Sequence, residues 1–237
     1  MARPNGVVIA SDRFWAFARL DGTVVEGVMP SPPRALRSLP LLRGLTRLVL
    51  ALSPIARRTG TATRAERLGL LAALVLPFCL VFVPREAALA LGCALTVALL
   101  AMLFRGRTLS LHGAEHRAIA AAEERRLDET WDGRARPSRF SPRCGTNFAA
   151  LAAPVTFLAD RMWPLPVAVW TPLAVTVLSL ALTMELWQLV QASGGRVARG
   201  FLLPGLALQR LTTREPALEE TRIALRAVDS VLRRELA

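Results

Sequence analysis

Residues 87–104, AALALGCALTVALLAMLF, and residues 164–191, PLPVAVWTPLAVTVLSLALTMELWQLVQ, decide the fold that the sequence predicts. The first stretch carries no charge, and the second has one ionisable residue, Glu185. A helix needs about 20 mainly apolar residues, in a range of about 17–25, to cross a bilayer. Residues 68–83 come close to that length, and residues 148–159 fall short of it. We therefore expect an all-α membrane protein with four transmembrane helices in two hairpins.

The composition favours a membrane protein over a soluble helical core, which is the alternative interpretation. Hydrophobic residues make up 53% of the chain, and the mean hydropathy is +0.38. Uncharged blocks of this length are unusual inside soluble helical proteins. Residues 148–159 are the weakest of the four blocks, and a re-entrant segment is the alternative there.

The arginines predict the orientation of the chain. All 30 basic residues are arginine, and the net charge is +12. All but Arg85 and Arg161 lie before residue 68, within residues 105–143 or after residue 191. An even number of spans places these regions on one side, and the positive-inside rule makes that side the cytoplasm. We expect a multi-pass protein of the bacterial inner (cytoplasmic) membrane with both termini cytoplasmic. The partner is then the lipid bilayer and no nucleic acid, because no aromatic-interleaved basic groove is present.

The polar segments contain smaller elements. Residues 7–29 predict a β-hairpin with a turn at Asp21-Gly22, and residues 38–53 predict an interfacial amphipathic helix. Pro204-Gly205 predicts a break in the chain, and residues 216–236 predict a cytoplasmic C-terminal helix. Six regions follow: a cytoplasmic N-terminal region with the β-hairpin (1–37), the interfacial amphipathic helix and linker (38–67), the first transmembrane hairpin (68–104), a cytoplasmic loop with a metal motif (105–147), the second transmembrane hairpin (148–191), and a cytoplasmic tail and helix (192–237).

The cytoplasmic loop carries the run His112-Gly113-Ala114-Glu115-His116, which contains both histidines of the chain. Residues four apart share one face of a helix, where two imidazoles can hold one metal ion. His-x-x-Glu-His is also the inverted zinc-protease motif, in which two histidines hold zinc and the glutamate activates water. We predict His112 and His116 as ligands of a divalent metal, zinc, and Glu115 as a catalytic general base. The alternative is a set of solvated residues on a charged helix.

A zinc site needs a third protein ligand, and catalytic sites leave the fourth position to water. Cys144 is one candidate, because a thiolate suits zinc and the flanking Arg143 lowers the pKa of a thiol. Glu185 is the other, either as a ligand or as the ion-pair partner of an arginine, because a lone carboxylate within a span is costly. Glu123 lies about 10 Å along the helix from His116, so we expect it to support the ligands rather than bind.

Five runs of the sequence carry a resemblance to a known family: HGAEH (112–116), PRCGTNF (142–148), PGLALQRLTTREP (204–216), EGVM (26–29) and LRG (42–44). Together they resemble the YqhQ-like family, domain of unknown function 1385, and the match extends over nearly the whole chain. The resemblance implies a multi-spanning bacterial membrane protein that is regarded as a metal-dependent enzyme and has no settled reaction.

The resemblance also implies which residues belong to the site. The chain departs from the family after the EGVM run, where Pro30-Ser31-Pro32-Pro33 replaces the usual Met-Arg-Gly-Pro. Arg143 and Asn147 lie in the PRCGTNF run, and we expect a supporting role for both, as for Glu123 and Glu26. The family pattern maps onto His112, Glu115, His116, Glu123, Cys144, Glu185 and Glu26.

The function that the sequence predicts is metal-dependent hydrolysis of a membrane-associated peptide or lipid at the cytoplasmic interface. Its partner is then a membrane-embedded substrate or protein. The alternative is a non-catalytic membrane scaffold with a structural metal site, which predicts four protein ligands including both Cys144 and Glu185. A transporter is less favoured, because no predicted span carries paired acids.

Overall fold

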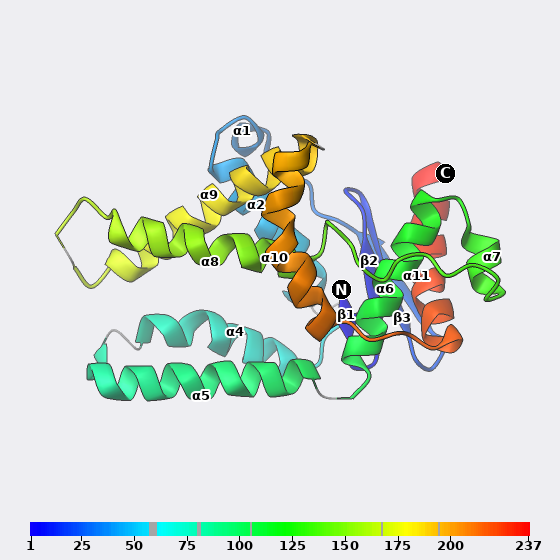
Figure 1. Ribbon diagram of the computed structural model, residues 1–237, viewed down its shortest axis with the longest axis horizontal. Helices are drawn as coiled ribbons and strands as arrows, with labels where there is room; N and C mark the ends of the chain where they lie inside the picture. The colour runs from blue at the N-terminus through cyan, green and yellow to red at the C-terminus, as the bar shows by residue number, and fades with distance from the viewer. Residues whose placement is uncertain (57–60, 80–81, 105, 167, 194) are drawn as a thin grey trace.

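The computed structural model describes residues 1–56, 61–79, 82–104, 106–166, 168–193 and 195–237, with some side chains in residues 55–104 outside this description. A body of sheet and helices lies on the right in Figure 1, and pairs of long helices extend from it to the left. The elements are β1 (Ala2–Arg3), β2 (Gly6–Ala10), β3 (Phe14–Arg19), β4 (Val24–Val28), α1 (Arg34–Arg37), α2 (Leu42–Ala51), α3 (Ser53–Ala56), α4 (Arg64–Cys79), α5 (Arg85–Phe104), α6 (Thr108–Glu123), α7 (Leu127–Trp131), α8 (Gly145–Arg161), α9 (Thr171–Ser193), α10 (Arg196–Thr212) and α11 (Leu218–Leu236).

The four strands form one antiparallel sheet in the order β1-β2-β3-β4. Val8 of β2 is opposite Phe17 of β3, and Ala16 of β3 is opposite Glu26 of β4. The turn between β3 and β4 places Gly22 at φ 88°, a conformation that glycine adopts without steric cost. The sheet therefore contains the predicted hairpin and adds the short strand β1 to it.

The two faces of the sheet bury different side chains, because successive residues of a strand point to opposite sides. Val7 and Ile9 pack in the main core against α6 and α11. Val8 points the other way, into a smaller cluster with Trp15, Phe17 and Met29. Fully buried alanines on α6 allow α11 to approach closely, and they are Ala114, Ala118 and Ala121. The N-terminal sheet and the C-terminal helix thus form one packed body.

The long helices form two pairs on the other side of the molecule (Figure 1). Helices α4 and α5 make one pair, and α8 packs against α9 in the other. Helix α2 also packs on α9, where the Cβ of an alanine at Gly44 would lie 2.6 Å from Met184 Cβ. The predicted amphipathic helix over residues 38–53 is shorter than expected. It begins at Leu42 because Leu41 has a φ of 66°.

The prediction of four transmembrane helices is wrong. One helix among the residues that the structure describes, α9, is long and apolar enough to cross a membrane. Helix α4 has 16 residues and is charged in its first turn, so it extends about 24 Å against a hydrocarbon core of about 30 Å. Helix α8 has 17 residues, including Pro154, and ends at Arg161. Helix α5, which contains the predicted span over residues 87–104, has 20 residues, and several of its side chains lie outside the described part.

The predicted break at Pro204-Gly205 is also wrong. Helix α10 runs through both residues and packs against α8 and α9. A proline inside a helix costs about 3 kcal/mol relative to alanine. Packing offsets this cost, because one face of α10 is buried through Ala198, Leu202, Gly205 and Gln209.

Candidate metal centre

Helix α6 presents two histidines on one face and its buried alanines on another. His112 and His116 are one turn apart, and their ring centroids lie 4.5 Å from each other. His116 is 3% exposed. Helical geometry alone brings the two rings together, as the spacing in the sequence predicts.

A backbone carbonyl holds each imidazole ring through its Nδ1 atom. His112 Nδ1 lies 2.8 Å from the carbonyl oxygen of Thr212, the last residue of α10. His116 Nδ1 lies 2.7 Å from the carbonyl oxygen of Arg139. A carbonyl can only accept a hydrogen bond, so each Nδ1 carries the proton. The Nε2 atoms are left to bind a metal ion, an arrangement typical of metal-ligating histidines.

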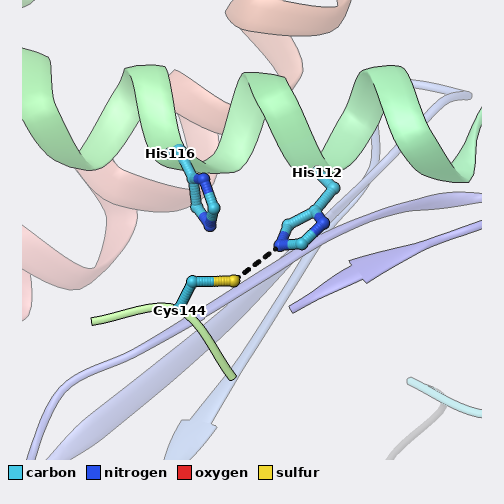
Figure 2. Close-up of side chains that lie close together, drawn as sticks. All are labelled: His112, His116 and Cys144. Carbon is cyan, nitrogen blue, oxygen red and sulfur yellow. Dashed lines mark hydrogen bonds between the residues drawn. The ribbon is translucent and has the colours of Figure 1, made fainter. Parts of the chain in front are cut away.

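Cys144 approaches the two rings from the chain segment that leads into α8. It is the N-cap residue of that helix and is 7% exposed. Its Sγ atom lies 3.2 Å from His112 Nε2 and accepts a hydrogen bond of 3.2 Å from the Thr146 hydroxyl. Figure 2 shows the thiol pointing at the two rings from the opposite side of the site. The structure therefore brings these three residues into one His–His–Cys cluster.

The electrostatics of the cluster favour a thiolate. Burial by itself raises the pKa of Cys144, but hydrogen bonds from His112 and His116 and the charge of His112 lower it to about 5. Burial likewise lowers the pKa of His112, while the hydrogen bond to Cys144 and the charge of Glu115 raise it above its ordinary value. The contact with His112 thus favours the thiolate form of Cys144 and, in turn, the protonated form of His112.

The donor set and its dimensions fit a zinc ion. The ligand atoms of His112, His116 and Cys144 all lie within 4.8 Å of one another. Tetrahedral zinc, with distances of about 2.0–2.1 Å to nitrogen and 2.3 Å to sulfur, places two ligand atoms roughly 3.5 Å apart. Small side-chain rotations would close this difference. Three protein ligands leave a fourth position to a further group, as in catalytic zinc sites.

Glu115 lies beside the cluster and lines the same pocket. Its side chain is 15% exposed, and its Oε1 atom lies 2.6 Å from the α-amino group of Met1. Burial raises the pKa of this carboxyl, but the charges of the α-amino group, His112 and His116 lower it below the usual range. Glu115 is therefore ionised at neutral pH and held at the pocket by a cation.

The structure does not bring Glu185 to the cluster. Its carboxylate accepts hydrogen bonds of 3.0 and 3.2 Å from Arg43 Nε, together with a further bond from Arg43 Nη2. The backbone N–H of Leu41 donates a further hydrogen bond of 3.0 Å to the carboxylate. Glu185 therefore has the second of its two predicted roles, as the ion-pair partner of an arginine. The Arg43–Glu185 ion pair joins α2 to α9.

Three of the four predicted supporting residues lie near the cluster or the segment that carries it. Glu123 and Arg143 form an exposed ion pair, and Arg143 lines the pocket. The Asn147 amide donates to the carbonyl oxygens of Ser141 and Pro142, at 2.9 and 3.0 Å, and so braces the segment before Cys144. Glu26 lies elsewhere, on β4, where it accepts a hydrogen bond from Ser230 of α11.

Two residues that the sequence analysis did not single out also hold this segment. Gln209 of α10 is fully buried and makes two hydrogen bonds with the Ser141 backbone, of 2.9 and 2.8 Å. Arg117 of α6 donates to the Pro137 carbonyl oxygen at 3.1 Å and pairs with Glu215 at 2.7 Å. Gln209 lies inside the PGLALQRLTTREP run and Arg117 directly follows the HGAEH run, and this is the one signal that the sequence offers for them.

The cluster opens on a pocket of about 730 Å³ between α6, α11 and the sheet. Its polar side contains the three cluster residues, Glu115 and Thr146. Apolar side chains line the pocket as well, and they are Ile9, Ile119, Val228, Val231 and Leu232. The arrangement therefore combines candidate metal ligands and an acid with space for an apolar group.

Fold and site together define a class of protein: a mainly helical chain in which one helix of the described part is apolar enough to span a membrane, with a His–His–Cys cluster at a pocket. The chain belongs to the family described as protein of unknown function (DUF1385), whose model matches residues 86–234. The matched region includes the whole His–His–Cys cluster and α10. The predicted resemblance to the YqhQ-like family is confirmed.

A curated relative gives the same assignment. The chain is 33% identical to the "Uncharacterized protein YqhQ" of Bacillus subtilis (strain 168) over 135 residues. This alignment covers 54% of the chain and 42% of that protein, so the chain matches less than half the length of its relative. No solved structure matches the chain.

Proposed function

We propose that this protein is a metal-dependent hydrolase whose zinc ion is held by His112, His116 and Cys144. One observation carries the proposal: all three candidate ligands and Glu115 line a single pocket. A metal held by three protein ligands would have a position left for a substrate or water, and the pocket that these residues line would give access to it.

Each residue has a separate task in this proposal. The two histidines and the thiolate bind the metal, and the Thr212 and Arg139 carbonyls fix the orientation of the rings. When bound, zinc lowers the pKa of a coordinated water to about 7 and polarises a carbonyl group. Glu115 accepts the proton of the attacking water as a general base. The α-amino group of Met1 has to leave Glu115 first, because a paired carboxylate is a poor base.

The pocket favours a substrate with an apolar portion. Its wall of isoleucine, valine and leucine side chains suits a fatty acyl chain or an apolar peptide side chain. A peptide or lipid of the membrane would present such a group. We therefore propose a membrane-associated peptide or lipid as the substrate class.

We further propose attachment to the bacterial cytoplasmic membrane through the α8–α9 pair. Helix α9 has the length and composition of a span. The sheet precedes α9 in the chain and α11 follows α9, yet the sheet and α11 pack against each other. The sheet and α11 then lie on one side of the membrane, so the chain has to cross once more before α9, through α8 together with the segment that joins it to α9. The many arginines of the sheet body and tail favour the cytoplasmic side.

The experiment measures hydrolysis by zinc-loaded protein in detergent, with a quenched fluorescent peptide and a fluorogenic phospholipid as probes. Glu115→Gln should lower the rate by about 10²–10⁴ while the zinc content stays unchanged, because the amide cannot take a proton. Glu123→Gln is the matched control, since Glu123 is exposed and paired with Arg143. Equal rates for Glu115→Gln and wild type would sink the catalytic proposal.

A second candidate function rests on the Cys144–His112 contact itself. A thiol 3.2 Å from an imidazole that a carbonyl orients is also the arrangement of a cysteine nucleophile. A chelator distinguishes the two, because it removes zinc-dependent hydrolysis and leaves a thiol nucleophile active. The scaffold alternative would require Glu185 as a fourth ligand, and the ion pair with Arg43 does not favour it.

A further inference from the structure

Helix α10 has an exposed apolar stripe beside its packing face. The residues that pack on α8 and α9 occupy one face of the helix. A second set follows the same helical spacing about a quarter turn away, where each side chain is solvent-exposed. This stripe consists of Val197, Phe201, Leu208 and Leu211, with exposed fractions of 77%, 46%, 43% and 63%.

Arginines occupy another flank of the same helix. Arg196, Arg199 and Arg210 recur at helical spacing and are all exposed. Leu203 lies among them and is 63% exposed. Apolar side chains next to a row of basic ones are typical of helices that lie flat in the headgroup region, where basic side chains reach lipid phosphates.

The position of α10 in the fold agrees with such a role. It follows α9 directly in the chain and crosses the α8–α9 pair at the end next to the sheet body (Figure 1). If α9 spans the bilayer, this end of the pair lies where the bilayer meets the cytoplasm. The exposed stripe of α10 then continues the apolar surface of the α8–α9 pair, and the arginines match anionic headgroups.

We infer that α10 lies in the plane of the membrane surface, with its apolar stripe in the lipid and its arginines on anionic headgroups. The inference rests on the proposed attachment of α8–α9 to the membrane. It also places the candidate centre, because the carbonyl of Thr212 at the end of α10 accepts the His112 Nδ1–H. The cluster is then held directly at the lipid surface.

The test measures the depth of single fluorophores in the full chain reconstituted into phosphatidylcholine–phosphatidylglycerol vesicles. Phe201→Cys and Leu208→Cys report on the stripe, Leu203→Cys on the arginine flank and Val177→Cys on exposed α9. Each is built on Cys79→Ala/Cys93→Ala, with buried Cys144 retained and its background signal subtracted. The quenchers are phospholipids with a nitroxide in the headgroup or the acyl chain, and aqueous iodide.

We expect headgroup nitroxide to quench positions 201 and 208, iodide to quench position 203, and acyl-chain nitroxide to quench position 177. Iodide quenching at 201 and 208 with lipid quenching at 177 would overturn the inference and leave membrane attachment intact. If neither the lipid nitroxides nor iodide quenches positions 201 and 208, a protein partner covers the stripe, and this result would also overturn the inference. Iodide quenching at position 177 would contradict the proposed attachment of α8–α9 to the membrane. If lipid quenching at position 201 is the same in vesicles without phosphatidylglycerol, the arginines do not bind anionic headgroups.

Discussion

The Nε2 atom of His112 and the Sγ atom of Cys144 lie 3.2 Å apart, although the two residues belong to different helices. His112 is on α6, which is packed in the sheet body, and Cys144 caps α8, which belongs to the helical pair. The contact therefore joins the two parts of the molecule at the candidate site. A metal ion bound there would strengthen the same connection.

The reactivity of Cys144 should depend on pH with a midpoint near 5 in metal-free protein. The thiolate is the reactive form, and its fraction rises as the pH passes the pKa, which His112 and His116 lower to about 5 against the effect of burial. Alkylation by iodoacetamide, measured on Cys79→Ala/Cys93→Ala protein, should be fully developed by pH 7. In His112→Ala the midpoint should move towards the ordinary value of about 8.5. An unchanged midpoint would show that His112 does not lower the pKa of Cys144.

Gly205→Ala should lower both metal content and thermal stability, although Gly205 is not a candidate ligand. A Cβ at this position would lie 2.1 Å from Asn147 Oδ1 and 2.4 Å from Asn147 Cα. Asn147 braces the segment before Cys144, so its displacement moves the thiol away from the histidines. Overpacking of this kind costs about 1–3 kcal/mol. Calorimetry and zinc analysis measure the two effects.

Gly200→Ala is the matched control on the same helix. A Cβ at Gly200 would meet nothing within 4 Å, and alanine favours helix over glycine by about 1 kcal/mol. Stability should stay equal or rise, and zinc content should not change. A Gly205→Ala protein that behaves like Gly200→Ala would show that α10 does not position the Cys144 segment.

Arg43→Gln should lower the thermal midpoint without changing the metal content. The substitution leaves the Glu185 carboxylate, 18% exposed, without its ion-pair partner between α2 and α9. Arg43→Gln/Glu185→Gln should recover part of the loss, because the unpaired charge is removed as well. Differential scanning fluorimetry with parallel zinc analysis provides the measurement. Loss of zinc in Arg43→Gln would show that Glu185 does belong to the metal site.

Local patterns in the sequence predicted the elements that depend on nearby residues. The i,i+4 spacing of His112 and His116 fixes their common face on α6. Asp21-Gly22 marks the turn of the sheet, and the charged segment after Pro216 forms α11. Each of these features depends on contacts within a few residues, which periodicity and turn preferences report well.

Features that depend on distant contacts could not be predicted. The sequence left the third ligand open between Cys144 and Glu185, and the fold separates them by pairing Glu185 with Arg43. Pro204 indicates a break in isolation, but the packing of α10 on α8 and α9 retains the helix. The carbonyl of Thr212 has no sequence signal, because every residue has a carbonyl group.

The predicted number of spans was wrong for a related reason. Hydropathy identifies apolar blocks, while the length of the helix that forms depends on where polar residues cap or interrupt it. Helix α4 starts within the charged run at Arg64, and α8 ends at Arg161. The length and composition of α9 meet the requirement for a span among the described residues.

The most direct test of the central claim is the zinc content of purified protein, prepared without chelators. We predict one zinc ion per chain in wild type, and loss of most of it in His112→Ala, His116→Ala and Cys144→Ala, because each removes one of three ligands. Glu185→Gln should keep its zinc, since its carboxylate is bound by Arg43. Wild-type protein that contains no zinc and takes up none on titration would contradict the account.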